Sequence, residues 1–134
     1  MKIVTKEISL KTSGQGDLVN ITDDLRILLK ESRLREGSLL VFAAGSMFSV
    51  AACEYELGLM KDMGDLYERL APAGAVYSSG DNGFGHLRSA LQGQSLTIPF
   101  RDAKLMLGAR QQVVVAEFDA ARDRQVVAQF TGEL

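Results

Sequence analysis

The part of the sequence that most constrains the fold lies near its C-terminus, where two apolar runs of strand length flank a short charged segment. Residues Gln112–Phe118 and Gln125–Phe130 are rich in valine, whereas residues 119–124 contain two aspartates and two arginines. Two such runs around a charged connection are typical of a β-hairpin whose loop faces solvent. We therefore expect the chain to close with an antiparallel pair of strands.

Other stretches have the alternation or the length of β-strands. Residues 2–10 alternate between apolar and polar side chains, which predicts a first strand. Two apolar runs, Ser38–Ala44 and Met47–Cys53, predict two buried strands around a tight Gly-Ser turn. Residues 95–100 alternate again, and Leu105–Leu107 predicts one more short strand.

Three segments have helical periodicity or residues that start and stop helices. The leucines of residues 25–34 recur at three- and four-residue spacings, which predicts a helix that stops at Gly37. Apolar residues recur in the same way over residues 59–70, and this second helix must end before the following proline. A third, short helix is expected between Asn82 and Gly93.

This order of elements predicts an α+β protein with mostly antiparallel β-sheet layers and about three helices. At 134 residues the chain has the length of one compact domain, so residues 1–134 are expected to fold as a single unit. Apolar residues make up 46% of the sequence and charged residues 24%, a balance that excludes wholesale disorder.

The charge and the cysteine content bear on partners and location. Lys and Arg number 15 and Asp and Glu 17, so the basic excess that favours nucleic acid is missing. No apolar run has the length of a membrane span, and we expect no membrane partner. Arg122 and Arg124 alternate with acidic neighbours, which predicts a solvated face. The single cysteine, Cys53, fits a core position in a cytoplasmic protein.

The best candidate site is the stretch Gly80–Pro99, which holds the only histidine, His86, behind a glycine-rich turn. A turn followed by a helix leaves backbone N–H groups that suit an anion or a polar ligand, and a histidine suits acid or base chemistry near neutral pH. The alternative is structural: Asp81 or Asn82 caps the helix, and His86 only packs on its first turn. Without a second histidine or a Cys-x-x-Cys motif, we expect no zinc site within one chain.

A pair of acids, Glu54 and Glu56, lies where a predicted buried strand gives way to a helix. In extended backbone, residues two apart share a face, so the two carboxylates could hold one hydrated Mg²⁺. The alternative is that both are negative charges placed favourably at a helix N-terminus.

Two further polar residues, Arg110 and Gln111, stand at the start of the valine-rich strand. A guanidinium there could hold a phosphate or a carboxylate through paired hydrogen bonds. It could equally be an exposed charge that discourages edge pairing. Ser46 lacks the Gly-x-Ser-x-Gly pattern of a hydrolase nucleophile, so we consider it for substrate binding only.

Four segments carry a further signal when they are considered together: Gly14–Thr22, Cys53–Leu59, His86–Pro99, and Leu107-Gly108 followed by Gln111. In this order they resemble the successive signatures of the YjbQ-like family, also called the secondary thiamine-phosphate synthase family. The resemblance implies a compact α+β fold and a homotrimer with sites near the subunit boundaries. It also implies a weak thiamine-phosphate synthase activity, which joins a pyrimidine diphosphate to a thiazole phosphate.

The chain departs from the family pattern at places that bear on the site. Many members carry a His-Thr pair where this chain has Gly45-Ser46, although one branch, which this sequence resembles more closely, also has Gly-Ser there. Many carry Thr-Trp-Gln where this chain has Ala109-Arg110-Gln111. The departures remove a metal ligand or catalytic base and one wall of the pocket. The polar residues that remain by position are Glu54, Glu56, Asn82, His86 and Gln111.

Two functions follow from these residues. The first is a trimeric enzyme that acts on small phosphorylated metabolites without an organic cofactor. In it His86 would be the acid or base, Glu54 and Glu56 would bind Mg²⁺, and the substrate would contact Ser46, Asp81, Asn82, Arg88, Arg110 and Gln111. The second is a non-catalytic trimer that binds a metabolite or a protein partner through a partly eroded site.

Overall fold

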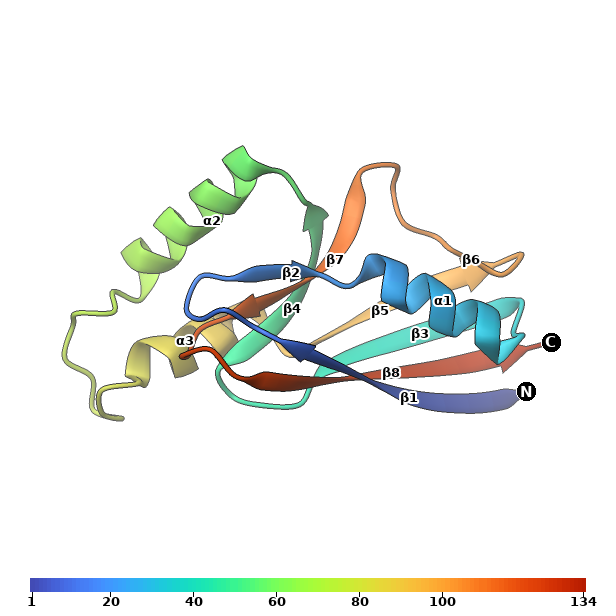
Figure 1. Ribbon diagram of the computed structural model, residues 1–134, viewed down its shortest axis with the longest axis horizontal. Helices are drawn as coiled ribbons and strands as arrows, with labels where there is room; N and C mark the ends of the chain where they lie inside the picture. The colour runs from blue at the N-terminus through green and yellow to red at the C-terminus, as the bar shows by residue number, and fades with distance from the viewer.

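Figure 1 shows the computed structural model of the protein, which describes residues 1–134. Strands and helices follow one another along the chain. The strands are β1 (Lys2–Lys11), β2 (Leu18–Asn20), β3 (Glu36–Ala43), β4 (Phe48–Glu54), β5 (Ser95–Arg101), β6 (Lys104–Leu105), β7 (Gln111–Glu117) and β8 (Asp123–Glu133). The helices are α1 (Thr22–Ser32), α2 (Leu57–Leu70) and α3 (Gly83–Gln92).

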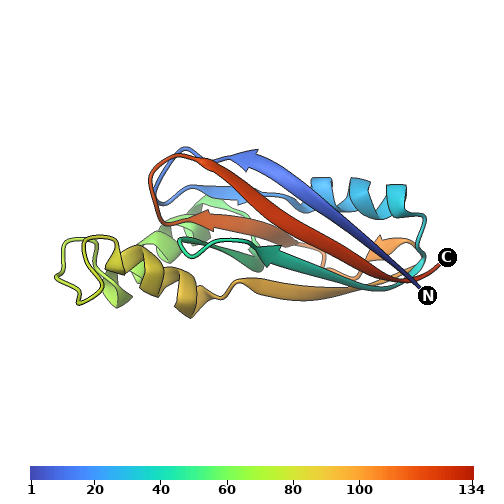
Figure 2. The same ribbon diagram turned by 90° about the horizontal axis from the view of Figure 1, so that it is seen from below.

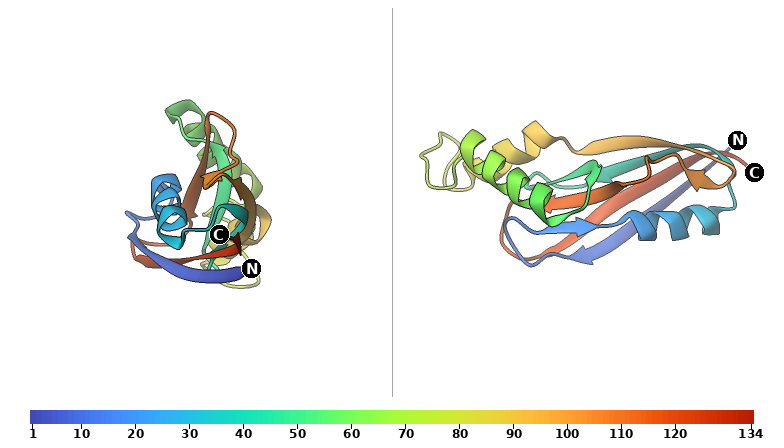
Figure 3. Two further views of the ribbon diagram at one scale, coloured as in Figure 1. Left: turned by 90° about the vertical axis from the view of Figure 1, so that its right-hand side faces the viewer. Right: turned by 90° about the horizontal axis from the view of Figure 1, so that it is seen from above.

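The strands form two antiparallel sheets, and the α+β fold expected from the sequence is confirmed. One sheet has the order β1-β8-β3-β5-β6, and the other has the order β2-β7-β4. Both sheets and α1 contribute side chains to one core, among them Leu29, Leu39, Val115 and Phe130. Figures 2 and 3 show that α2 and α3 lie at one end of the molecule and that both termini lie at the other.

The closing hairpin expected from the sequence is wrong, although both of its strands exist as β7 and β8. Strand β7 pairs with β2 and β4, whereas β8 pairs with β1 and β3 in the other sheet. Alternation reveals which face of a strand is buried, but it does not reveal which strand lies beside it. In β8 buried and exposed residues alternate, while Val113–Glu117 of β7 is buried on both faces.

Helix α2 covers the face of β7 that points away from the main core, which is why β7 is buried on both faces. Its half-buried side chains Met60, Met63 and Tyr67 pack on a small cluster that includes Val114 and Phe118. No residue of α2 itself is buried, and three of its four leucines, at positions 57, 66 and 70, are exposed, while Leu59 is half-buried. The helix therefore covers the three-stranded sheet with one edge and leaves much of its apolar surface uncovered.

The predicted helix stop at Gly37 is also wrong. Helix α1 ends at Ser32, and Arg33 adopts a left-handed conformation with φ of 63°. Gly37 instead lies within β3, directly opposite Gly132 of β8. A Cβ atom at Gly37 would lie 2.0 Å from the carbonyl oxygen of Thr131. The glycine is thus required by a close approach of two backbones and not by the end of a helix.

A buried ion pair connects the two sheets near the end that carries α3. The guanidinium of Arg124 on β8 donates to the carboxylate of Glu117 on β7, with Nε 2.8 Å from Oε1. Thr12 donates to the same oxygen at 2.6 Å, and Arg124 stacks 4.5 Å from the ring centroid of Phe48. The solvated face expected for Arg124 is therefore wrong, because its side chain is 9% exposed and that of Glu117 is 0% exposed.

The hydrogen bonds of this pair set its protonation state. Burial alone would raise the pKa of Glu117, but hydrogen bonds from Arg124, Thr12 and the backbone of Asp119 hold the pKa below its ordinary value. Glu117 is therefore a carboxylate at neutral pH, and the guanidinium of Arg124 balances its negative charge inside the protein.

No helix of the structure has the length and apolar content that a membrane span requires.

Candidate functional site

The stretch that carries His86 forms α3, which packs on the beginning of β4. Gly85 lets the helix also approach Phe118, which follows β7, since a Cβ atom at position 85 would lie 2.9 Å from the carbonyl oxygen of Phe118. One turn later, Ser89 donates its hydroxyl hydrogen to the carbonyl of Phe48 at 2.8 Å. With Gly85 and Ser89 facing the sheet, His86 and Leu87 are exposed on the outer side of the helix.

The start of α3 leaves polar groups uncommitted. Asn82 is the N-cap residue, yet its side chain makes no capping hydrogen bond, and both Asp81 and Asn82 are exposed. At the other end Gly93 terminates the helix with φ of 102°, as the sequence predicted. Asp81, Asn82 and His86 therefore share one exposed helix start, and their side chains are available to a ligand.

Arg88, on the same helix, is already engaged within the chain. Its Nε atom donates to the carbonyl of Ala71 at 3.0 Å, and its Nη2 atom lies 2.7 Å from the carboxylate of Glu68. The guanidinium also lies 5.1 Å from the ring centroid of Phe84, and the side chain is 5% exposed. Arg88 thus fastens the end of α2 to α3, and this buried position differs from the phosphate-holding role predicted for it.

A second group of predicted residues meets where β4 ends and β7 begins. Glu54 is the register partner of Gln111, and its carboxylate forms an ion pair with Arg110. The Arg110 side chain is 80% exposed, so most of its donors still face solvent. Gln111 accepts a hydrogen bond from the backbone N–H of Gly108 at 3.0 Å, which fixes the loop before β7.

Glu56 takes the structural alternative that the sequence left open. Its backbone is extended, and its carboxylate accepts hydrogen bonds from the backbone N–H groups of Gly58 and Leu59 at the start of α2. No cluster of three or more His, Cys, Asp or Glu residues occurs within the chain. Glu54 makes no such capping bonds, and its carboxylate is 38% exposed and paired with Arg110.

Ser46 lies with its glycine neighbour in the exposed turn between β3 and β4, at the end where α3 packs. A Cβ atom at Gly45 would come within 2.7 Å of the Phe48 ring. The space beside Gly45 is therefore filled by Phe48, which is held in turn by Arg124. A histidine at position 45 would require this aromatic ring to move.

The predicted residues fall into two groups at opposite ends of β4. The helix group consists of Ser46, Asp81, Asn82 and His86, and the strand-end group consists of Glu54, Arg110 and Gln111. The seven residues of β4, Phe48–Glu54, span about 20 Å at the usual rise of a strand. A single copy of the chain therefore does not bring His86 to Glu54.

Sequence reasoning missed Tyr67, which stands between the two helices. Its hydroxyl donates to Gln92 at 2.7 Å, and its ring makes an edge-to-face contact with Phe118 at 4.9 Å. Burial, with a smaller effect from half-buried Cys53, raises the pKa of Tyr67 to about 12. Its place in the apolar stripe of the second predicted helix was a signal for packing, but not for this contact with α3.

The fold and the two polar groups define a small antiparallel α+β protein. It has exposed polar residues at both ends of β4 and uncovered apolar surface on α2 and α3. Residues 6–133 match the family described as UPF0047 protein YjbQ-like. The chain belongs to this family, and the resemblance noted from its motifs is confirmed.

Relatives and solved structures agree with this assignment. A UPF0047 protein from Methanothermobacter thermautotrophicus is 32% identical over 136 residues, which cover 99% of this chain and 95% of the relative. A UPF0047 protein from Archaeoglobus fulgidus is 32% identical over 124 residues, which cover 90% and 96%. The crystal structure of a YbjQ-like protein of unknown function from Sulfolobus solfataricus is similar with a TM-score of 0.93 at 28% identity, covering 98% of this chain and 99% of that one.

Proposed function

We propose that the protein is a cytoplasmic homotrimeric transferase that joins a pyrimidine diphosphate to a thiazole phosphate, with each site formed between neighbouring subunits. The observation that supports this most is the separation of the two polar groups along β4. Each group alone lacks part of the machinery, and a cyclic assembly, in which each copy meets its neighbour through two different surfaces, would allow one group of each copy to lie beside the other group of the next.

Uncovered apolar surface supports the assembly. On α2, Leu57 is 83% exposed and Leu70 is 60% exposed, and on α3 Leu91 is 67% exposed. These helices lie at the same end of the molecule (Figure 2). Apolar side chains that stay exposed in one copy of the chain are available for burial against another copy.

The proposed roles follow from charge. Displacement of diphosphate depends chiefly on neutralising the leaving group and on positioning the two substrates. Arg110 would neutralise phosphate oxygens with its solvent-facing donors, and His86 would act as the acid or base. One carboxylate with substrate phosphates is a common way of binding Mg²⁺, so Glu54 would hold this ion together with the diphosphate. Asp81, Asn82, Ser46 and Gln111 would orient the substrates.

The direct test is an assay of thiamine phosphate formation by the purified protein and its variants. His86→Ala should lower the rate by about 10²–10⁴-fold, the usual contribution of a general acid or base. Arg110→Gln should lower it as well, whereas Lys6→Gln, which removes an exposed cation on β1, should leave it unchanged. Absence of activity, or activity that is indifferent to His86, would refute the enzymatic proposal.

Subunit mixing tests whether the site is shared. His86→Ala and Glu54→Ala subunits, each inactive alone, should regain about a quarter of the wild-type activity after random reassembly, because each mixed trimer contains one intact site. Failure to recover activity from proven mixed trimers would place both groups in separate sites.

The engaged states of Arg88 and Glu56 favour a second candidate, a non-catalytic trimer that binds a metabolite or a protein partner. If no turnover is found, a rise in the thermal unfolding temperature with a phosphorylated metabolite would support this candidate, since a ligand of the native state raises apparent stability. No shift across a broad panel would exclude small-molecule binding at these groups.

A further inference from the structure

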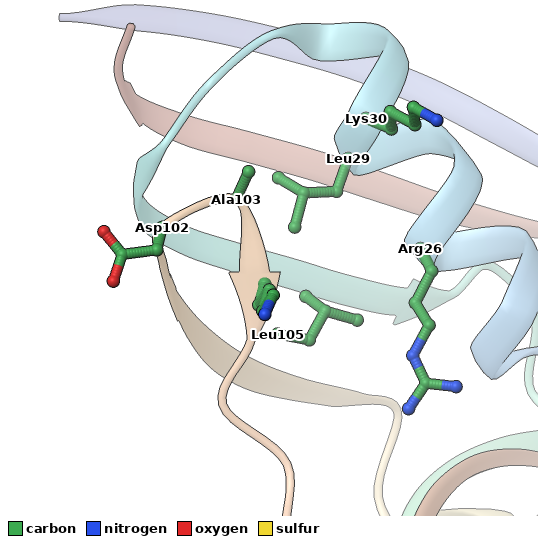
Figure 4. A pocket seen from close by; sticks show the side chains of 7 residues that line it. Arg26, Leu29, Lys30, Asp102, Ala103 and Leu105 are labelled. Carbon is green, nitrogen blue, oxygen red and sulfur yellow. The ribbon is translucent and has the colours of Figure 1, made fainter.

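A pocket lies beside α1 and β6, at the opposite end of the molecule from α2 and α3 (Figures 1 and 4). Its volume is about 510 Å³, which is within the range of sites for small molecules. One face of α1 and the β5–β6 hairpin line it with Arg26, Leu29, Lys30, Asp102, Ala103, Lys104 and Leu105. None of these residues belongs to the helix group or the strand-end group.

The floor of the pocket is apolar. Leu29 is buried in the core below it, and Leu105 is half-buried on β6. Figure 4 shows the side chains of Leu29, Ala103 and Leu105 between the helix and the hairpin. Because Leu29 is itself buried, the apolar surface left for a ligand comes from Ala103 and Leu105.

The rim of the pocket is cationic. The lining contains three cations, Arg26, Lys30 and Lys104, and one acid, Asp102, in a chain whose net charge is −2. Arg26 pairs with Asp23 through one nitrogen at 3.2 Å and is 51% exposed, so its guanidinium retains donors for a ligand. In Figure 4 the carboxylate of Asp102 points away from Arg26, on the far side of the apolar floor. Lys30 and Lys104 form no ion pair within the chain, so the rim keeps positive charge.

The hairpin wall is fixed in place. Asp102 and Ala103 both adopt left-handed conformations, with φ of 55° and 59°, in the turn between β5 and β6. The backbone N–H of Ala103 donates to the carbonyl of Arg35 at 2.9 Å, which ties this turn to the segment that follows α1. A wall held in this way loses little conformational freedom when a ligand binds.

We infer that this pocket binds a phosphate monoester of a small apolar alcohol. The phosphate would contact Arg26 and the neighbouring lysines, and the apolar body would lie on Ala103 and Leu105. A phosphate monoester is largely a dianion above its second pKa of about 6, which matches a rim of several cations better than a single negative charge does. A guanidinium suits phosphate oxygens because its donors form a planar fork.

The test is a titration of the ¹⁵N-labelled protein with phenyl phosphate, followed by amide NMR shifts. Saturating shifts should centre on residues 26–30 and 102–105. Benzoate should bind more weakly, and benzyl alcohol and inorganic phosphate should bind more weakly still. Affinity for phenyl phosphate should fall as the pH is lowered through about 6, where the dianion takes up a proton.

Variants locate the site and separate it from the proposed transferase. Arg26→Gln with Lys104→Gln should raise the dissociation constant roughly tenfold, whereas Arg69→Gln should not change it. Ala103→Asn should also block binding, because it fills the pocket with a residue that tolerates the left-handed conformation. His86→Ala should bind phenyl phosphate as the wild type does.

Three results would overturn the inference. They are an absence of saturating shifts at the hairpin, equal affinity for inorganic phosphate and phenyl phosphate, and undiminished binding by the folded Arg26→Gln, Lys104→Gln protein. None of these results would bear on thiamine phosphate formation, which uses other residues.

Discussion

Removal of Arg124 should destabilise the protein strongly, because it would leave the Glu117 carboxylate buried without its cation. Glu117 is fully buried and receives hydrogen bonds from Arg124 and Thr12. Breaking a buried ion pair on one side costs about 3–5 kcal/mol. This cost is a large part of the roughly 5–15 kcal/mol by which domains are usually stable. Arg124→Met should therefore lower the free energy of unfolding in urea by about 3–5 kcal/mol.

A double variant separates the ion pair from simple packing. Arg124→Met with Glu117→Leu removes both charges and keeps apolar volume, so it should recover most of the stability that Arg124→Met loses. Two results would show that the ion pair does not cause the loss of stability. They are a fall of less than about 1 kcal/mol in the free energy of unfolding of Arg124→Met, and a double variant as unstable as the single one.

The same pair predicts a pH dependence. Because the pKa of Glu117 is lowered in the folded protein, its contribution is present above the unfolded value of about 4.3 and is lost as the pH falls through the folded pKa. The wild type should lose stability more steeply on acidification below about pH 4.3 than the double variant does. Equal slopes in urea titrations over this range would contradict the lowered pKa.

Three further substitutions test contacts described above. Gly37→Ala should destabilise the protein by about 1–3 kcal/mol in urea unfolding, because the added methyl group would meet the Thr131 carbonyl. The control is Gly64→Ala on α2, where no atom lies within 4 Å of the added methyl group, and this change should be neutral or stabilising. Glu56→Ala should cost about 1 kcal/mol through the lost N-cap of α2, and Glu31→Ala provides an exposed control in thermal unfolding. Arg88→Met should cost about 1–3 kcal/mol and speed hydrogen exchange at the end of α2, and unchanged exchange there would mean that Arg88 does not hold the two helices together.

Most elements of the fold could be predicted from the sequence, because periodicity is a local property. The spacing of Leu25 and Leu29 predicted the buried face of α1, and the alternation of Ile98 and Phe100 with polar residues predicted the buried face of β5. Pairing between strands is not local. Nothing in the segment between β7 and β8 distinguishes a hairpin loop from a connection between two sheets, so the closing hairpin was wrong.

The candidate site was predictable in its residues but not in its geometry. The sequence indicated Glu54, Arg110 and Gln111 separately, and the antiparallel register of β4 and β7 brings them together. Buried positions were the main source of error. Arg88 and Arg124 resemble surface cations in sequence, and only tertiary contacts reveal that their charges are matched inside the protein.

The position of β8 between β1 and β3 also constrains how the chain can fold. Strand β1 pairs with β8 alone, through residues 2–11 and 123–132. During synthesis β1 therefore remains unpaired until β8 has left the ribosome. Contacts between such distant segments form slowly, so completion of the large sheet should limit the folding rate. The interval before β8 arrives is when the nascent chain is most exposed to aggregation through β1.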